Sequence, residues 1–195
     1  MYYDTLYLMN ELKNYASPKS KLTALVRSGE YTRIKRGLYV KGSEYDLKTL
    51  ANIIYGPSYI SFEYALSFYG MIPERVEVVT SATFNKNKDK TYDTPVGTFK
   101  YKYINTDLYF KGINRMEENE EPFLIATREK ALCDILYKIK DFKKDSNIED
   151  VLFSSLRIDE DELLKLNITD LKLLAPLYKR IITDKLLEYL KMRRK

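Results

Sequence analysis

The residues best placed to do chemistry in this sequence are the lysines and arginines near its beginning. Between Lys19 and Lys41 the chain carries seven cations and one anion, Glu30, a local net charge of +6. The whole chain carries +5, so all the other residues together carry −1. The seven cations are Lys19, Lys21, Arg27, Arg33, Lys35, Arg36 and Lys41. Positive charge gathered in this way is typical of a surface that contacts nucleic acid, although a solvated basic face without a partner has the same composition.

Most enzyme chemistry lacks its usual residues in this chain. Histidine is absent, which removes Ser-His-Asp catalysis, Cys-His catalysis and histidine metal sites. The one cysteine, Cys133, cannot form an internal disulfide or a cysteine-rich zinc site, and its place beside Leu132 favours burial. All seven glycines are isolated, so no Walker loop or GxGxxG turn can form. We therefore predict no enzymatic activity, no bound metal and no cofactor.

Two acidic runs keep an enzymatic alternative open. A metal-dependent, nucleic-acid-processing enzyme needs clustered carboxylates, and residues 117–121 and 159–162 are the candidates. We expect the first run in a loop and the second at a helix start, where acids stabilise the positive end of a helix. A third possibility is a protein-interaction module without DNA binding, built on amphipathic C-terminal helices.

Two helices are predicted to precede the most basic stretch. Residues 4–15 have apolar side chains at helical spacing. Ser17 followed by Pro18 is the pattern of a second helix start, and Gly29 is the pattern of its end.

The two faces of this second helix differ in character. Its apolar face, which we expect to pack inward, carries Leu22, Leu25 and Val26. Its opposite face carries Ser20, Thr23, Ala24 and Arg27. Because these are small or polar side chains with one long cation, the backbone could approach a DNA groove closely while Arg27 reaches out.

Residues 31–40 then have the pattern of a β-hairpin with its turn at Gly37. Alternation places Arg33 and Lys35 on one side of the first strand and Ile34 on the other, with Arg36 at the tip. A helix followed at once by a basic hairpin is the arrangement of a winged helix. Its helix enters the major groove, and its wing contacts phosphates or the minor groove.

This arrangement yields eight candidate DNA-binding residues with two roles. The predicted phosphate contacts are Lys19, Lys21, Arg33, Lys35 and Arg36. The predicted base-reading residues are Ser20, Thr23 and Arg27. Neutralising about five phosphates predicts a log–log salt slope of about −4 to −5.

The rest of the chain predicts an α+β fold with a helical end. We expect strands near residues 76–84, 97–104 and 123–126, and helices over residues 62–69, 128–140 and most of 148–190. A further helix over residues 47–54 is expected to start at a capping box formed by residues 43–46. The basic tail, residues 191–195, is expected to be frayed and solvated.

Length and composition allow one large domain or two small ones, because the chain has 195 residues, of which 45% are hydrophobic. We place the boundary at the end of the hairpin. Residues 1–42 then form a winged-helix DNA-binding domain, and residues 43–195 form a mixed α/β domain with a helical end. No apolar run approaches the roughly 20 residues needed to cross a bilayer, and the start lacks a signal-peptide pattern, so we expect a cytoplasmic protein.

Four segments of the sequence, in this order, resemble a known family. Residues 20–40 (SKLTALVRSGEYTRIKRGLYV) are similar to the family's winged-helix start, and residues 56–74 (GPSYISFEYALSFYGMIPE) to the opening of its second domain. Residues 76–99, with TPVG at 94–97, and residues 123–137 (FLIATREKALCDILY) are similar too. The family is that of the AbiEi-type antitoxins of type IV toxin–antitoxin systems, and the resemblance covers roughly residues 5–140.

The resemblance implies a function in abortive infection, a form of phage defence. Members of this family are not enzymes. An N-terminal winged helix-turn-helix binds inverted repeats at the operon's own promoter and represses transcription, and a C-terminal domain is needed for antitoxicity. The toxin is a nucleotidyltransferase encoded alongside, which the antitoxin need not contact directly. The DNA-binding residues that carry over lie from Lys19 to Arg27 on the helix and from Arg33 to Arg36 on the wing.

The sequence departs from the family pattern at one place. Many members have an extra helix before the recognition helix, whereas here only residues 16–18 separate the two expected helices.

Overall fold

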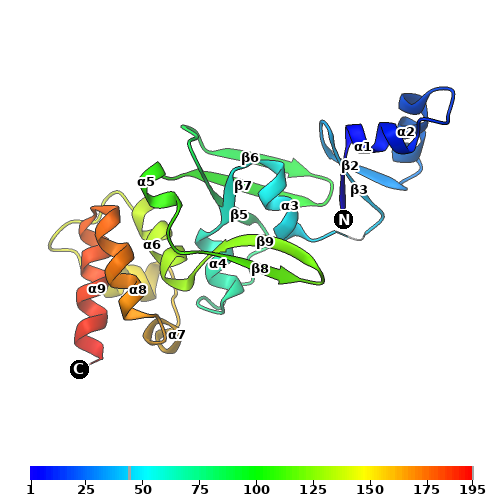
Figure 1. The fold of residues 1–195 in the computed structure, drawn as a ribbon. Helices are drawn as coiled ribbons and strands as arrows, with labels where there is room; N and C mark the ends of the chain where they lie inside the picture. The colour runs from blue at the N-terminus through cyan, green and yellow to red at the C-terminus, as the bar shows by residue number, and fades with distance from the viewer. Residues whose placement is uncertain (44, 195) are drawn as a thin grey trace.

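The computed structural model describes residues 1–43 and 45–194 and is a mixed α+β fold. Its N-terminal part, blue in Figure 1, contains two helices and a small sheet. The elements are β1 (Tyr2–Asp4), α1 (Thr5–Glu11), α2 (Pro18–Arg27), β2 (Tyr31–Lys35) and β3 (Leu38–Lys41). The strands pair antiparallel in the order β1-β3-β2.

Local caps explain where the two helices begin and end. The Asp4 side chain accepts a hydrogen bond from the backbone N–H of Tyr7 at 2.7 Å, so α1 begins at Thr5. Ser17 caps α2, and Pro18 occupies the first turn, as the sequence predicts. Gly29 follows α2 with φ +79°, a left-handed conformation that glycine adopts without strain.

A six-stranded mixed sheet organises the larger part of the chain (Figure 1). Its strand order is β6-β7-β5-β4-β9-β8. The strands are β4 (Ser58–Ile60), β5 (Val79–Thr83), β6 (Lys90–Thr94), β7 (Gly97–Tyr103), β8 (Ile113–Glu118) and β9 (Glu121–Ala126). The β4/β9 and β5/β7 pairs are parallel, and the other neighbours are antiparallel.

Helices surround this sheet and then continue to the C-terminus. The first four are α3 (Leu47–Ile54), α4 (Phe62–Phe68), α5 (Thr106–Tyr109) and α6 (Arg128–Lys138). The last third comprises a π-helix, η1 (Asp150–Ser155), α7 (Glu160–Leu164), α8 (Ile168–Leu174), a 3-10 helix, η2 (Ala175–Tyr178), and α9 (Ile181–Arg193). Helices α8 and α9 pack on α6, at the end of the molecule opposite α2 (Figure 1).

The expected strands and helices of the larger part are present. Three strands of this part, β4, β6 and β8, and β1 of the N-terminal part are additional to the prediction. Residues 117–121, expected as a loop, instead end β8 and begin β9 around a tight turn, in which Asn119 and Glu120 both have positive φ. Both β6 and β8 are edge strands. Edge strands carry charged, solvent-facing side chains and therefore lack a strong apolar pattern.

The structure also corrects both ends of the predicted larger domain. The cap of α3 is Asp46, which accepts hydrogen bonds from the backbone N–H groups of Lys48 and Thr49 at 2.6 and 3.3 Å, so the predicted cap at Ser43 is wrong. Glu44 lies outside the described residues. The basic tail is not frayed, because α9 continues to Arg193. Arg194 donates a hydrogen bond to the Leu166 carbonyl at 2.6 Å, and Lys195 lies outside the described residues.

The β2–β3 hairpin belongs to two apolar clusters. Ile34, Leu38 and Val40 join the large core around the six-stranded sheet. Tyr39 faces the other way, into a small cluster with Leu8 of α1 and Leu22 of α2. Both faces of the hairpin are therefore covered along most of its length.

A fully buried ion pair links the sheet layer to the C-terminal helices. The Lys130 ammonium lies 2.8 Å from the Asp134 carboxylate, one helical turn away on α6, and neither side chain is exposed. Lys130 also donates hydrogen bonds to the Leu108 carbonyl and to the Tyr178 hydroxyl, each at 2.7 Å. All three ammonium protons of Lys130 are thereby used.

The carboxylate of Asp134 is equally well satisfied. Its Oδ1 accepts a hydrogen bond from Tyr178 at 2.6 Å, and its Oδ2 accepts hydrogen bonds from Tyr59 at 2.9 Å and Ser61 at 2.8 Å. Burial and the nearby Asp134 charge raise the pKa of both Tyr59 and Tyr178, so each hydroxyl stays protonated and continues to donate.

None of the helices formed by residues 1–43 and 45–194 combines the length and apolarity that a membrane span requires.

Removing one member of the buried pair is expected to destabilise the fold strongly. Lys130→Met leaves Asp134 buried without its counter-charge, which costs about 3–5 kcal/mol of unfolding free energy. Urea denaturation followed by circular dichroism measures this loss. Lys172→Met on the exposed side of α8 is the matched control, with an expected change within about 0.5 kcal/mol. Equal stabilities for the two variants would contradict this role for the pair.

Candidate nucleic-acid interface

The exposed face of α2 has the composition that its sequence predicts. Leu22 is buried, and Leu25 and Val26 are half-buried. The side chains of Ser20, Thr23, Ala24 and Arg27 are exposed. Apart from Arg27, these side chains are short, so a groove of nucleic acid could approach the helix backbone closely.

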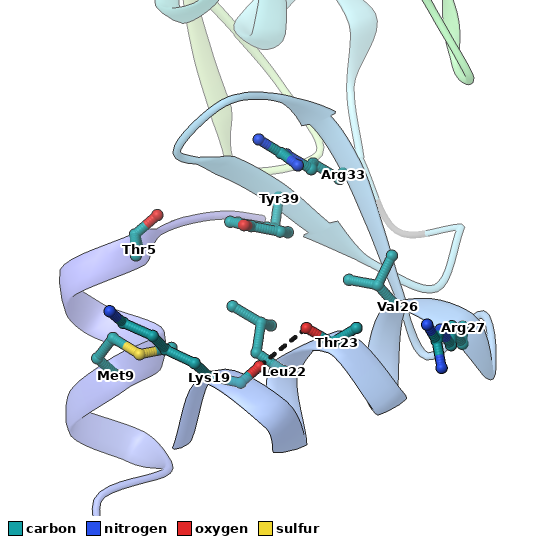
Figure 2. Close-up of a pocket in the computed structure, with 9 residues that line it drawn as sticks. All are labelled: Thr5, Met9, Lys19, Leu22, Thr23, Val26, Arg27, Arg33 and Tyr39. Atoms are coloured by element: carbon teal, nitrogen blue, oxygen red, sulfur yellow. Dashed lines mark hydrogen bonds between the residues drawn. The ribbon is translucent and has the colours of Figure 1, made fainter. Parts of the chain in front are cut away.

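A pocket of about 360 Å³ lies between α1, α2 and the β2–β3 hairpin (Figure 2). Nine residues line it: Thr5, Met9, Lys19, Leu22, Thr23, Val26, Arg27, Arg33 and Tyr39. Four of the eight predicted DNA-binding residues are therefore brought together, three from α2 and Arg33 from the hairpin. The sequence pattern does not identify Thr5, Met9 or Tyr39 as their neighbours, because only the fold brings α1 and β3 to this place.

Three cations surround the apolar floor of this pocket. Lys19 extends from α2 toward α1, Arg27 lies near the other end of α2, and Arg33 projects from the hairpin (Figure 2). Within residues 1–43 and 45–194, none of these three side chains forms an ion pair with an acid. Thr23 donates a hydrogen bond from Oγ1 to the Lys19 carbonyl at 3.0 Å, which keeps that hydroxyl on the helix.

Lys35 does not share a side with Arg33, contrary to the prediction from alternation. The β2–β3 register shifts between these residues, so that Arg33 pairs with Tyr39 and Lys35 pairs with Leu38. This bulge turns Lys35 toward the large core, where its ammonium donates a hydrogen bond to the Ile54 carbonyl at the end of α3. Burial and the nearby charge of Lys90 lower the pKa of Lys35.

The remaining predicted contacts lie apart from the pocket. Ser20 pairs its hydroxyl with that of Ser17 at 2.8 Å. The Lys21 ammonium lies 4.8 Å from the centre of the Tyr15 ring, where it contributes a cation–π contact. Arg36 is exposed beside Gly37 at the hairpin tip.

Two lysines of the larger part of the chain, Lys86 and, at the start of β6, Lys90, add positive charge near the hairpin. The ammonium groups of Lys86 and Lys90 lie 5.2 and 4.9 Å from the centre of the Tyr55 ring. Tyr55 directly follows Ile54, whose carbonyl holds Lys35. The sequence pattern does not reveal this proximity, because Lys86 and Lys90 are far from Tyr55 along the chain.

The acidic runs have structural partners. Asp159 caps α7 by accepting the backbone N–H of Glu162 at 3.0 Å, and the Glu162 carboxylate pairs with Arg128 at 2.5 Å. In the other run, Glu118 pairs with Lys48 at 3.2 Å. No group of three or more His, Cys, Asp or Glu side chains in the described parts of the chain is arranged to hold a metal ion.

No family model matches the chain, and no curated protein matches it.

The position of Lys35 predicts a stability effect rather than a surface effect. Lys35→Met keeps most of the apolar stem but leaves the Ile54 carbonyl without its donor, which is expected to cost about 1–2 kcal/mol. Arg36→Met, one residue along and exposed, is the matched control and should change stability by no more than about 0.5 kcal/mol. Urea denaturation of both variants tests this difference. A larger loss for Arg36→Met would show that the tip, not Lys35, holds the hairpin in place.

Proposed function

We propose that this protein is a DNA-binding transcriptional autorepressor. The observation that carries the proposal is that Lys19, Arg27 and Arg33 line one pocket beside an exposed, small-residue face of α2. Cations without acidic partners are available to contact DNA phosphates, and an α-helix beside them has the width to enter the major groove. The chain forms a strand, two helices and a hairpin in this order, and the strand and the hairpin pair in one small sheet. This order of elements supports a winged helix-turn-helix over residues 1–42.

In this proposal, α2 enters the major groove. Ser20 and Thr23 read base edges at close range, and Arg27 forms a bidentate contact to guanine, which is worth about 1–3 kcal/mol of discrimination. Lys19 and Lys21, near the start of α2, and Arg33 and Arg36 of the hairpin contact phosphates. Because Lys35 is held by α3, four phosphate contacts remain, and the expected salt slope falls to about −3 to −4.

We further propose that the chain is the antitoxin of a type IV, AbiE-like toxin–antitoxin system acting in abortive phage infection. This step rests on the sequence resemblance over roughly residues 5–140. The part of the chain from residue 43 onward would provide antitoxicity against a nucleotidyltransferase toxin, in the cytoplasm and without a required direct contact. The proposal assigns no catalytic step, cofactor or metal to this chain.

DNA binding is tested by fluorescence anisotropy with a duplex from the region upstream of the protein's own gene. Arg27→Ala is expected to reduce the preference for this duplex over a scrambled one by about 1–3 kcal/mol. Arg33→Ala and Arg36→Ala should weaken binding to both duplexes and reduce the salt slope by about one unit each.

Two controls make this experiment decisive. Lys35→Met should leave the salt slope unchanged, because that ammonium is already engaged by the Ile54 carbonyl. Lys172→Ala removes one positive charge from α8, far from α2, and should leave DNA affinity unchanged. If Arg27→Ala and Arg33→Ala together bind the upstream duplex as the unmodified chain does, the interface is wrongly assigned.

Antitoxin activity is tested by growth of cells that express a neighbouring nucleotidyltransferase gene together with this chain. The unmodified chain should restore growth. The double variant Arg27→Ala and Arg33→Ala should restore growth equally well from an inducible promoter while no longer repressing the native one, because the two functions are assigned to different parts of the chain. Failure of the unmodified chain to restore growth would exclude the antitoxin proposal but not the DNA-binding proposal.

A further inference from the structure

The pocket between α1, α2 and the hairpin has the size and lining of a small-molecule site. Its volume of about 360 Å³ falls within the range of ligand pockets, roughly 300–1,000 Å³. Its floor is apolar, formed by Leu22, Val26 and Tyr39, with Met9 at the side of α1. Leu22 and Tyr39 are already buried, so the apolar surface that remains open to water comes from the half-buried Val26 and Met9, and an apolar group that covers it is stabilised there.

The side chains around this floor are positively charged and therefore favour a ligand with negative charge. Every ionisable side chain that lines the pocket, apart from the Tyr39 phenol, is a cation: Lys19, Arg27 and Arg33. Among the residues that the structure describes, no acid lines the pocket. A ligand with an anionic head could accept charge-assisted hydrogen bonds from cations at the edge of the pocket while its body covers Val26.

A DNA duplex cannot satisfy both parts of this pocket. Its phosphates can contact the cations, but its apolar groups, the C–H groups of deoxyribose and the thymine methyls, belong to a stiff duplex that is too wide to enter a pocket of about 360 Å³ between α2 and the hairpin. The combination of an apolar floor with cations on several sides instead matches an amphiphilic molecule with one anionic end.

We propose that this pocket binds a small amphiphilic organic anion, a carboxylate or sulfonate with an aliphatic or aromatic body. We also propose that its occupation releases the protein from DNA. This second part rests on the proposed DNA-binding function. Because the ligand and DNA would use the same cations, each would lower the apparent affinity of the other by mass action.

Binding is tested with the full chain and a fluorescent probe of this chemistry, anilinonaphthalene sulfonate. We expect saturable binding at one site. Replacing either arginine, as in Arg27→Gln or Arg33→Gln, should weaken binding by about tenfold through the loss of one charge-assisted contact. Phenylnaphthylamine, which keeps the aromatic body but lacks the sulfonate, should bind about tenfold or more weakly for the same reason.

A pair of phenylalanine variants tests the location. Val26→Phe fills the floor and should abolish saturable probe binding. Leu173→Phe enlarges an exposed apolar residue of α8 and should leave probe binding unchanged. Urea denaturation confirms that each variant is folded, and the two glutamine variants keep the test valid if Val26→Phe does not fold.

Three results would overturn the pocket proposal. They are equal binding of the probe and its uncharged analogue, equal binding by the unmodified chain and both glutamine variants, and non-saturable binding. A concentration-dependent dimer that Val26→Phe converts to monomer, without probe binding, would overturn it too, because a second copy would then occupy the pocket.

The regulatory part has its own readout, so that its failure is separable from that of DNA binding. A saturating concentration of the probe should displace the protein from the upstream duplex in the anisotropy assay. Intact DNA binding in the presence of saturating probe would overturn the regulation and leave the proposed function standing. If the chain binds the probe at this pocket but binds no DNA, the proposed DNA-binding function and its proposed regulation are both overturned. The proposal that the pocket binds a small anion would still be supported.

Discussion

The larger part of the fold depends on the buried contact between Lys130 and Asp134. Burying two charges is costly, and the cost is offset only when every donor and acceptor is paired. Here the three protons of Lys130 and both oxygens of Asp134 have partners from β4, the segment after it, α5, α6 and η2. An apolar contact tolerates small displacements, whereas this network requires each element at a definite distance. It therefore fixes where the C-terminal helices stand relative to the sheet.

A second constraint acts on the hairpin, because its side chains pack into two different apolar clusters. Ile34, Leu38 and Val40 pack into the large core, and Tyr39 packs against α1 and α2. A regular strand alternates its faces, so the bulge between Arg33 and Lys35 is what lets neighbouring side chains turn to the same side. The two cations therefore have different positions: Lys35 holds the hairpin to α3, and Arg33 remains beside α2.

The different positions of Lys35 and Arg33 determine how much of the hairpin can contact DNA. A basic hairpin free on both faces would offer its whole length to DNA, whereas this hairpin offers Arg33 and its tip. The proposed interface is accordingly centred on α2 and on the pocket beside it. The same geometry brings cations and an apolar floor together, which links the proposed DNA contact to the proposed small-molecule site through shared side chains.

Local features were determined by the sequence alone. Ser17, Pro18 and Gly29 define α2 through their own hydrogen bonds and backbone preferences, and its exposed and inward faces follow from helical periodicity. Tertiary structure decided the rest. Alternation could not reveal the bulge at Lys35, nor could spacing reveal that Thr5, Met9 and Tyr39 would line one pocket with Arg33, because the arrangement of distant segments depends on packing rather than on local conformation. The apolar pattern likewise missed β6 and β8, since an edge strand gains its stability from hydrogen bonds to a neighbour that only the folded sheet supplies.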